Sequence, residues 1–419
     1  MTVDALNIFF NQTQVGVLSL DDKRLFSFSY SEKWLNDPGA FPLSISLPLG
    51  TTLFKDQKTR SFFANLLPES AVRELIARRL GISKKNDFML LERIGGECAG
   101  AITILPESIT PESWHQYTYR ILSESELAEL IKTILKRPLL SGEEGIRISL
   151  AGAQEKLALL FKESRFHIPL NGAPSNCILK PGMQHFQSSI ENEYFCMALA
   201  ASLNLNVSPV KIIGNKPQNA LFIQRYDRFF HNETVKRLHQ EDFCQAMGLS
   251  YELKYQADGG PGLKECFDLV RACSANPIKD LQRLLQWVFF NCLIGNMDAH
   301  AKNLSLLYDG RQIRLAPFYD MLCTTIYAGL SEKMAMKIGG ENRPEWIMER
   351  HWKKFATETN IRPDILKTQL TAFCHKMMAQ VEKSHAAFID EYGPNESVRD
   401  IASSIKERSN RMLEIGSHL

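Results

Sequence analysis

One stretch decides the fold of this chain, Leu293-Ile294-Gly295-Asn296-Met297-Asp298-Ala299-His300-Ala301-Lys302-Asn303, together with Pro317-Phe318-Tyr319-Asp320 downstream of it. Asp298 and Asn303 have D-x-x-x-x-N spacing, and a second carboxylate follows at Asp320 after a short apolar run. Phosphoryl transfer from ATP uses this set, because one carboxylate accepts the proton of a hydroxyl while an amide oxygen and another carboxylate hold magnesium. The stretch therefore predicts a kinase.

The D-x-x-x-x-N spacing alone is a weak signal, since Asp and Asn are common in turns. Its surroundings strengthen the prediction. Apolar residues recur at helical spacing from residue 278 to residue 293, and Gly295-Asn296 provides a helix stop. Residues 304–308 and 312–315, joined through Asp309-Gly310, are typical of a β-hairpin that leads toward Asp320. Helix, catalytic loop, hairpin and metal-binding Asp is the order of a kinase large lobe.

The composition is that of a folded protein with no extreme charge. The 419 residues exceed what one core usually supports, and 44% are hydrophobic and 23% charged. A net charge of +2 favours neither nucleic acid nor an anionic membrane as a partner. Nine scattered cysteines without a C-x-x-C pair indicate reduced thiols. No signal peptide and no bilayer-spanning apolar run is visible, so we expect a cytoplasmic protein without membrane contact.

We expect a separate N-terminal α/β subdomain over residues 1–139. Residues 5–30 alternate apolar and polar positions as short strands do, and a helix begins at Pro68-Glu69-Ser70 and stops at Gly81. A glycine-rich turn and buried strand at 94–105 and a helix at 123–136 follow. Ser141-Gly142-Glu143-Glu144-Gly145 is typical of a linker, which places the boundary near residue 140.

The rest of the chain predicts two lobes. Residues 140–235 form a small β-rich lobe, and residues 236–419 form a large helical lobe. The expected elements of the small lobe are strands at 157–161, 166–170, 177–180 and 220–223 and a helix at 191–204. A last helix is expected from roughly 397 to 413. The fold class is thus α+β, a protein-kinase-like two-lobed fold with an additional N-terminal subdomain.

The small lobe offers groups for a nucleotide. Lys180 ends an apolar strand, where its charge could reach the α- and β-phosphates. Glu191 and Glu193 are alternative ion-pair partners for it; we favour Glu193, and the sequence does not decide. Residues 224–226, Gln224-Arg225-Tyr226, occupy the hinge position that presents backbone groups to adenine. A G-x-G-x-x-G motif is missing, and the small residues of Ser149-Leu150-Ala151-Gly152-Ala153-Gln154-Glu155-Lys156 provide an anion-binding nest in its place.

At this point the sequence resembles the HipA serine/threonine kinase toxins of bacterial toxin–antitoxin systems. Residues 147–156 look like the family's phosphate loop, residues 298–303 like its catalytic loop, and residues 317–320 like its metal-binding strand end. Other similar stretches are Asn192-Glu193-Tyr194, Gln240-Glu241-Asp242, Asp258-Gly259-Gly260-Pro261-Gly262, Phe41 to Leu49, Asn65-Leu66-Leu67-Pro68 and Ile94-Gly95. The resemblance covers nearly the whole chain in order.

The resemblance implies an ATP- and Mg²⁺-dependent protein kinase that halts translation by phosphorylating an aminoacyl-tRNA synthetase, with glutamyl-tRNA synthetase as the first expectation, and so causes growth arrest and persistence. It implies Asp298 as base, Asn303 and Asp320 as metal ligands, and Lys180 as phosphate contact. The residues that it implies around the nucleotide are Ala151, Gly152, Ala153, Gln154, Glu155, Lys156, Lys180, Gln224, Arg225, Tyr226, His300, Ala301, Lys302, Asn303, Tyr319 and Asp320.

The resemblance also implies regulation and partners. Ser149 matches an inhibitory autophosphorylation site, and a small HipB-like helix-turn-helix antitoxin that binds operator DNA is the expected partner. Some members carry a lysine-rich loop that touches DNA, whereas this chain has Lys337-Ile338-Gly339-Gly340-Glu341-Asn342-Arg343-Pro344 there. Few cations remain to release counterions from DNA, so we expect DNA contact only through the antitoxin.

Two other functions fit parts of the sequence. A catalytically weak co-repressor subunit would need the antitoxin but not the complete acidic set. A small-molecule kinase shares the D-x-x-x-x-N logic but does not account for Ser149 or for the N-terminal subdomain.

Overall fold

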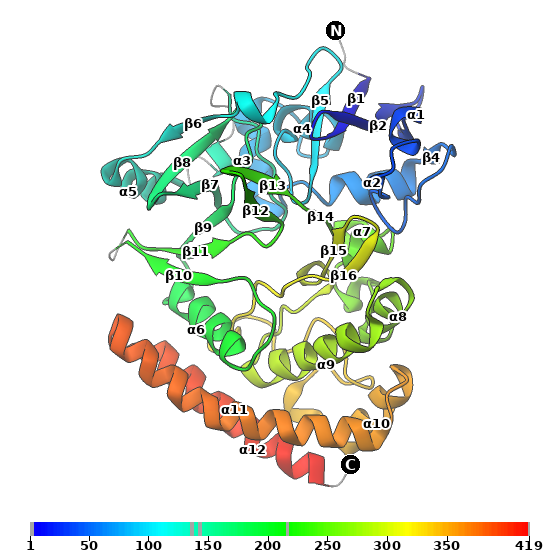
Figure 1. Ribbon diagram of the computed structural model, residues 1–419. Helices are drawn as coiled ribbons and strands as arrows, with labels where there is room; N and C mark the ends of the chain where they lie inside the picture. Colours follow the sequence, from blue (N-terminus) through cyan, green and yellow to red (C-terminus); the bar gives the residue numbers. More distant parts are fainter. Residues whose placement is uncertain (1–3, 135–137, 141–144, 215–217, 418–419) are drawn as a thin grey trace. The chain divides into compact units, whose positions relative to one another are not determined.

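A computed structural model describes residues 4–134, 138–140, 145–214 and 218–417 (Figure 1). Its contacts divide the chain into two compact units, each described here by itself. Unit 1 comprises Met1–Pro181, Ile213–Tyr251 and Leu306–Ile313, and unit 2 comprises Gly182–Ile212, Glu252–Ser305 and Arg314–Leu419. Residues 141–144 of the predicted linker lie outside the described residues, so the boundary near residue 140 stays a prediction.

The first part of unit 1 is built on a five-stranded antiparallel sheet with the strand order β4-β3-β2-β1-β5. Leu6 and Ile8 of β1 are fully buried, which is the alternation that a half-buried strand requires. Strands between residues 5 and 30 and a helix that ends before Gly81 are confirmed. The elements are β1 (Ala5–Phe10), β2 (Thr13–Leu20), β3 (Phe26–Tyr30), α1 (Glu32–Leu35), β4 (Phe54–Lys55), α2 (Asp56–Ala64), α3 (Ser70–Leu80), α4 (Asp87–Ile94) and β5 (Ile102–Pro106).

The second part of unit 1 contains a sheet whose strands from this unit run in the order β11-β9-β7-β8-β6. Every strand predicted in the small lobe is present, and the structure adds a hairpin of β12 and β13 that the sequence pattern did not predict. The elements are β6 (Thr118–Ile121), α5 (Glu124–Thr133), β7 (Leu157–Lys162), β8 (Arg165–Leu170), β9 (Cys177–Pro181), β11 (Ala220–Gln224), β12 (Arg228–His231), β13 (Thr234–Arg237), β14 (His239–Asp242) and α7 (Phe243–Ala246).

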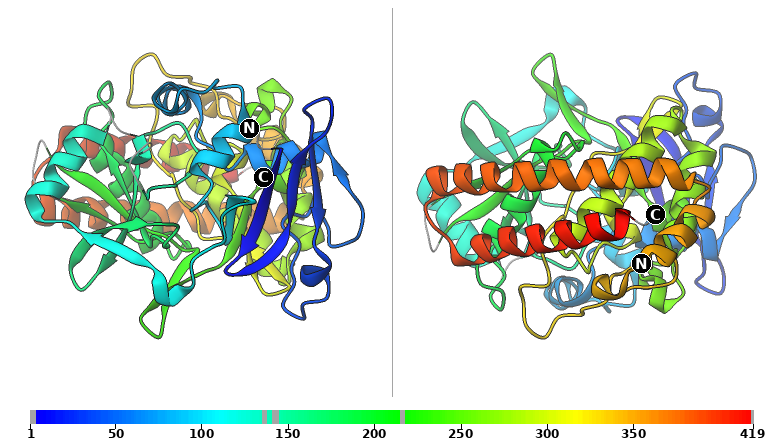
Figure 2. Two further views of the ribbon diagram at one scale, coloured as in Figure 1. Left: turned by 90° about the horizontal axis from the view of Figure 1, so that it is seen from above. Right: turned by 90° about the horizontal axis from the view of Figure 1, so that it is seen from below.

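Unit 2 is mainly helical. The long helices α11 and α12 lie side by side and contact α6 and α9 (Figure 2). Along α11, Leu366, Leu370 and Phe373 are buried at helical spacing, so one stripe of this helix faces the core. The elements are α6 (Ser189–Ser202), β10 (Val210–Ile213), α8 (Leu263–Cys273), α9 (Pro277–Ile294), α10 (Glu349–Glu358), α11 (Pro363–Tyr392) and α12 (Glu396–Ser417).

The predicted hairpin after the catalytic loop is also present. Its strands are β15 (Ser305–Asp309) and β16 (Gln312–Leu315), and the chain passes through them from unit 2 into unit 1 and back. They are neighbours in a three-stranded sheet with the order β14-β15-β16. Throughout the described ranges, every helix is too short or too polar to cross a lipid bilayer.

Candidate active site

The predicted catalytic loop begins where α9 ends. Gly295 caps this helix with a φ of +76°, a left-handed conformation that glycine adopts without strain. The turn that follows is fixed by buried amides: Asn296 donates to the Asn291 side chain at 2.8 Å and accepts from the Asp298 N–H at 3.0 Å. The Met297 N–H donates to the Thr324 hydroxyl at 2.9 Å. The backbone around Asp298 is therefore held rigidly.

Asp298 is the exposed member of an otherwise buried loop. Its neighbours in the stretch from residue 291 to residue 304 are buried, His300 and Lys302 among them. A carboxylate at the surface of a rigid buried loop can meet a hydroxyl group from solution, as a general base must.

Asn303 is joined directly to the same loop. Its Nδ2 donates to the Asp298 carbonyl at 3.2 Å, which fixes the plane of the Asn303 amide. The Tyr319 hydroxyl donates to the Lys302 carbonyl at 2.7 Å and lies 2.7 Å from the Ser305 hydroxyl. Tyr319 precedes Asp320, so this contact ties the segment with the second carboxylate, which lies beyond the end of β16, to the catalytic loop. Asp298 and Asn303 are thus joined by a hydrogen bond, and the segment that carries Asp320 is tied to the same loop through Tyr319.

Asp320 has a φ of +59°, which is uncommon for a residue other than glycine and typical of functional sites. On one side of it, Phe318 is held by the Ser208 N–H at 3.0 Å and by the Asn206 carbonyl at 2.7 Å. On the other side, the fully buried side chain of Asn192 in α6 makes two hydrogen bonds to the backbone of Cys323. It donates to the Cys323 carbonyl at 2.7 Å and accepts from the Cys323 N–H at 2.9 Å. These contacts hold the unfavourable conformation in place.

The donor set suits magnesium. An Asp carboxylate and an Asn amide oxygen are hard oxygen ligands, and Mg²⁺ commonly takes few protein ligands together with substrate phosphates. Within the described part of the chain, no cluster of three or more His, Cys, Asp or Glu side chains forms an all-protein metal site. Asn303 and Asp320 would then hold the ion together with ATP.

In unit 1, the predicted phosphate loop rests on the segment between α2 and α3. Ser149 is fully buried; its hydroxyl donates to the Leu66 carbonyl at 2.8 Å and its N–H to the Glu97 carbonyl at 2.8 Å. The Gly152 carbonyl accepts from the Glu69 N–H at 3.0 Å. Residues 151–156 are partly or fully exposed, in contrast to the buried residues just before them. The part predicted to meet phosphates is therefore the accessible part.

Lysines flank this loop. Lys156 Nζ donates to the Ala151 carbonyl at 2.6 Å and so closes the loop on itself. Lys180 lies in β9 opposite Leu221 of β11 and is buried, and its role as a phosphate contact stays a prediction. Glu191 and Glu193 both lie in α6 of unit 2 and are buried, so the choice between them stays open.

The side chain of Arg225 has a structural role, whereas the prediction for residues 224–226 concerned their backbone groups. It is buried and binds Asp227 at 2.8 Å and Glu97 at 3.0 Å, and its backbone N–H donates to the Asn176 carbonyl. Only its carbonyl group remains as a hinge contact. Among its neighbours, Gln224 is exposed and the Tyr226 hydroxyl donates to Gln240.

Arg225 belongs to a buried ionic cluster that the sequence did not predict. Glu97 also binds Arg228 at 3.0 Å and Arg237 at 2.9 Å. Burial opposes the charged form of Glu97, but the attraction of the three guanidinium groups is stronger and lowers the pKa of its carboxyl group. The cluster joins the turn before β5 to the strands β12 and β13. The closely spaced arginines after β11 could have indicated an ionic cluster, but their partner Glu97 is distant from them in the sequence.

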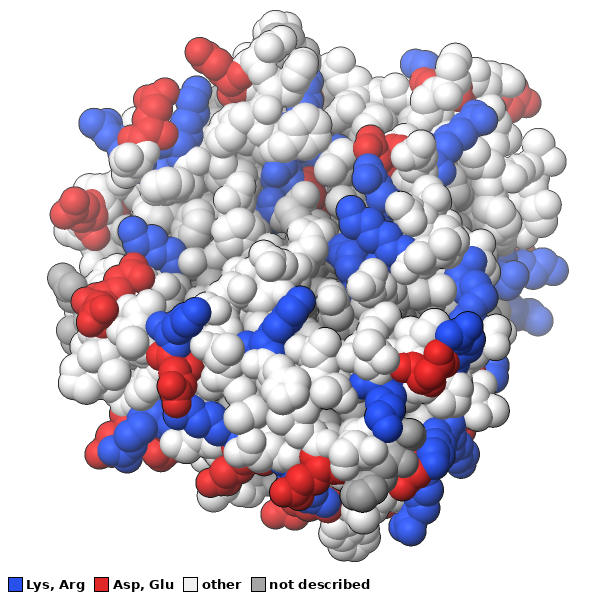
Figure 3. All heavy atoms as spheres, turned by 60° about the horizontal axis from the view of Figure 1, so that its bottom comes forward, with Lys and Arg blue, Asp and Glu red and all other residues white. Residues whose placement is uncertain are grey.

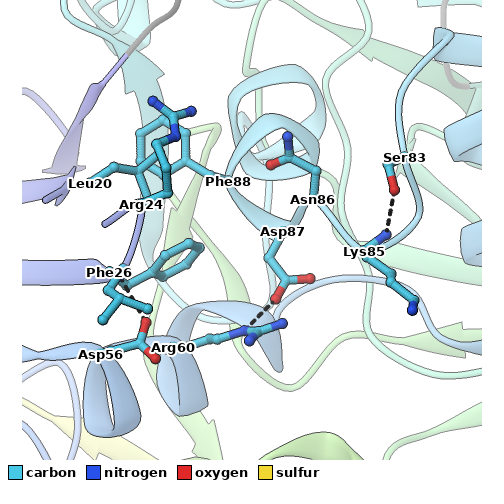
Figure 4. A pocket seen from close by; sticks show the side chains of 11 residues that line it. Leu20, Arg24, Phe26, Asp56, Arg60, Ser83, Lys85, Asn86, Asp87 and Phe88 are labelled. Carbon is cyan, nitrogen blue, oxygen red and sulfur yellow. Dashed lines mark hydrogen bonds and ion pairs between the residues drawn. The ribbon is translucent and has the colours of Figure 1, made fainter. Parts of the chain in front are cut away.

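A pocket of about 410 Å³ lies elsewhere in unit 1 (Figure 4). None of the predicted site residues lines it. Its carboxylates have structural partners, because Asp87 binds Arg60 and Arg73, and Asp56 accepts from the Phe26 N–H at 2.8 Å. The lining residues are Leu20, Arg24, Leu25, Phe26, Asp56, Arg60, Ser83, Lys85, Asn86, Asp87 and Phe88. This pocket is not the candidate active site.

Two family models match the chain. Residues 6–105 match the HipA N-terminal domain, and residues 148–384 match the HipA-like C-terminal domain. The chain is 38% identical over 413 residues to "Putative kinase Y4mE" of Sinorhizobium fredii, with 98% of each chain covered. It is 29% identical over 412 residues to "Serine/threonine-protein kinase toxin HipA" of Shewanella oneidensis, covering 92% of this chain and 93% of that one.

A solved structure is similar over nearly the full length. It is the complex of Shewanella oneidensis HipA with HipB and its operator DNA, and its matching chain has a TM-score of 0.86 at 28% identity. The match covers 99% of this chain and 98% of that one. The α+β fold predicted from the sequence is thereby confirmed.

Proposed function

Because this chain belongs to the HipA family, we propose that it is a serine/threonine protein kinase toxin that transfers the γ-phosphate of ATP to a protein hydroxyl group. The observation that carries the proposal is the exposed Asp298 in a rigid buried loop, with Asn303 bonded to the same loop. A kinase named as a toxin is among the similar proteins.

The chemistry assigns a role to each residue. Asp298 accepts the proton of the attacking serine or threonine hydroxyl, whose oxygen forms a bond to the γ-phosphorus while the bond to the β-phosphate oxygen of ADP breaks. Lys180 and the backbone of residues 151–156 bind phosphate oxygens. Asn303 and Asp320 would hold magnesium, which would neutralise charge on the phosphates of ATP.

The proposed substrate is an aminoacyl-tRNA synthetase, with glutamyl-tRNA synthetase as the first choice. Its phosphorylation would arrest translation and growth in the cytoplasm, and persistence would follow. This proposal is supported by the family resemblance of the active-site stretches, in agreement with the toxin among the similar proteins.

The substrate can be identified directly. Purified protein is incubated with ATP, magnesium and cell extract, and new phosphopeptides are identified by mass spectrometry against an Asp298→Asn control. We expect a serine of a synthetase. Phosphorylation of small molecules alone would contradict the proposal, and nucleotide binding without any transfer would favour the catalytically weak co-repressor.

We further propose that Ser149 is autophosphorylated and that this modification switches the kinase off. Phosphorylation would add a charge of about −1.5 to −2 to Ser149. A phosphoserine with this charge could not remain in the buried position that Ser149 has between Ile148 and Leu150. The loop would have to leave the Leu66 carbonyl, and residues 151–156 would lose their arrangement. We expect phosphate at Ser149 in protein expressed in active form, and Ser149→Ala should still phosphorylate a substrate. A Ser149 that remains unmodified in active enzyme would contradict this proposal.

The proposed partner is a small HipB-like antitoxin, supported by the similar HipA structure with HipB and operator DNA. We propose that this chain reaches DNA only through that partner. In the loop at residues 337–344, Ile338 and Glu341 form a tight bridge, Glu341 accepts from the Arg343 N–H at 2.9 Å, and the Arg343 guanidinium stacks on Trp346 at 4.2 Å. The face shown in Figure 3 carries both basic and acidic side chains. The contacts of Glu341 and Arg343 argue against a phosphate-binding surface at residues 337–344.

A further inference from the structure

Tyr255 lies against the candidate base. Its hydroxyl donates a hydrogen bond of 2.6 Å to Asp298 Oδ1, and its ring packs edge-on against the His300 ring with the centroids 5.1 Å apart. The carbonyl of the preceding Lys254 accepts from the Ala301 N–H at 3.3 Å. Residues 254 and 255 thus contact the catalytic loop at three positions, by a side-chain hydrogen bond, a ring contact and a backbone hydrogen bond.

The other side of this segment is anchored as well. The Gln256 N–H donates to the Ala335 carbonyl at 3.2 Å, and its Oε1 accepts from the Lys337 N–H at 2.7 Å. The Ala335 N–H in turn donates to the Met297 carbonyl at 2.9 Å, one residue before Asp298. Tyr255 is therefore held between two segments that are themselves bonded to each other, and its hydroxyl has a defined position.

The glycine stretch that follows supports the same arrangement. The Gly260 N–H donates to the Tyr255 carbonyl at 3.0 Å, which folds residues 255–260 into a closed turn. A Cβ atom at Gly260 would lie 1.9 Å from the Leu253 carbonyl oxygen and 2.7 Å from the Tyr255 carbonyl oxygen. Only glycine fits at this position. The stretch Asp258-Gly259-Gly260-Pro261-Gly262 therefore has a structural role, because it closes the turn that presents Tyr255.

A carboxylate at the surface can rotate, and only some of its orientations suit proton transfer to it. A hydrogen bond from a fixed hydroxyl to a charged oxygen is among the stronger hydrogen bonds, and it restricts this rotation. We infer that Tyr255 is a positioning residue for phosphoryl transfer, which holds Oδ1 of Asp298 so that Oδ2 faces the substrate hydroxyl. This inference rests on the proposed kinase function, but the contact itself can be tested without activity.

The test uses Tyr255→Phe in the full-length protein, because phenylalanine keeps the ring against His300 and removes only the hydroxyl. The matched control is Tyr194→Phe, which removes a phenol-to-carboxylate hydrogen bond of 3.3 Å to Glu391 between α6 and α11. We expect Tyr255→Phe to lower kcat about tenfold or more with KM for ATP unchanged. The control should keep the wild-type kcat. A change in KM alone, or a wild-type kcat in Tyr255→Phe, would overturn the inference.

Crystal structures of wild type and Tyr255→Phe provide the measurement that needs no activity. We expect one Asp298 side-chain orientation in the wild type, and altered or multiple orientations in the variant. The same single orientation in both would overturn the inference even if no transfer is detected. Suppose that the wild type transfers phosphate and that Asp298→Asn does not. A kcat of Tyr255→Phe equal to that of the wild type would then contradict only the role inferred for Tyr255. If the wild type transfers no phosphate, the proposed function is contradicted instead. The crystal structures then test whether Tyr255 orients Asp298.

Discussion

Asp320 combines a proposed metal ligand with a left-handed backbone, a φ of +59°. Asparagine tolerates this conformation better than alanine does, because its short polar side chain bonds locally. We expect Asp320→Asn and Asp320→Ala both to lose phosphoryl transfer, since each removes the carboxylate. In urea denaturation Asp320→Ala should be less stable than Asp320→Asn by about 1–2 kcal/mol. Equal stability of the two variants would contradict the proposed strain.

Glu241 is a second residue whose surroundings have a measurable consequence. Burial raises the pKa of its carboxyl group to about 7, although the Tyr308 hydroxyl and the Ile45 N–H donate to it. The folded state therefore binds a proton that the unfolded state releases near pH 4.3. The contribution of this proton to the free energy of unfolding is fully present below the pKa of the unfolded state, and it is lost as the pH rises through about 7.

Glu241→Gln separates this contribution from other titrating groups, because glutamine stays neutral. We expect the variant to gain stability relative to wild type between pH 5 and pH 8, by up to about 3 kcal/mol. Thermal or urea denaturation over that range measures it. A difference between the two proteins that does not change with pH would show that Glu241 does not titrate there.

Helices and their ends could be predicted from the sequence, because they depend on the spacing of apolar residues and on residues close to one another in the chain. The α9 helix and its stop at Gly295 follow from apolar spacing and a residue that accepts positive φ. The β12–β13 hairpin was missed although Asn232 and Glu233 at its turn both have positive φ, for which Asn was the available signal. Its exposed Phe229 and Phe230 do not show the alternation that marks a half-buried strand.

The ionic cluster that joins the turn before β5 to β12 and β13 gives a prediction about elements. Glu97→Gln would leave three buried arginines with one carboxylate fewer, and the loss of a buried partner costs about 3–5 kcal/mol. We expect a large fall in the free energy of unfolding, measured by urea denaturation. The control is Glu74→Gln, which breaks an exposed pair with Lys84 at 2.9 Å and should change stability little. Similar losses in both variants would contradict the importance of burial.

At the scale of the whole molecule, the order of motifs along the chain predicted the fold and most candidate residues. Contacts between distant residues could not be predicted. The Tyr255 hydrogen bond to Asp298 spans 43 residues, and the Arg225 contact with Glu97 spans 128. Such pairings depend on how the chain folds back on itself, and local patterns in a single sequence do not contain them. For that reason the sequence predicted neither the contact of Tyr255 with Asp298 nor the ion pairs of the Arg225 side chain.

The central claim is that Asp298 is the base of a protein kinase, and transfer of radiolabelled phosphate from ATP to protein substrate tests it most directly. Asp298→Asn keeps the size and polarity of the side chain but removes its basicity. The matched control is Asp390→Asn, an exposed aspartate on α11. We predict that Asp298→Asn lowers the transfer rate by about 100-fold or more, while the control transfers like wild type. Transfer by Asp298→Asn at the wild-type rate would contradict the claim.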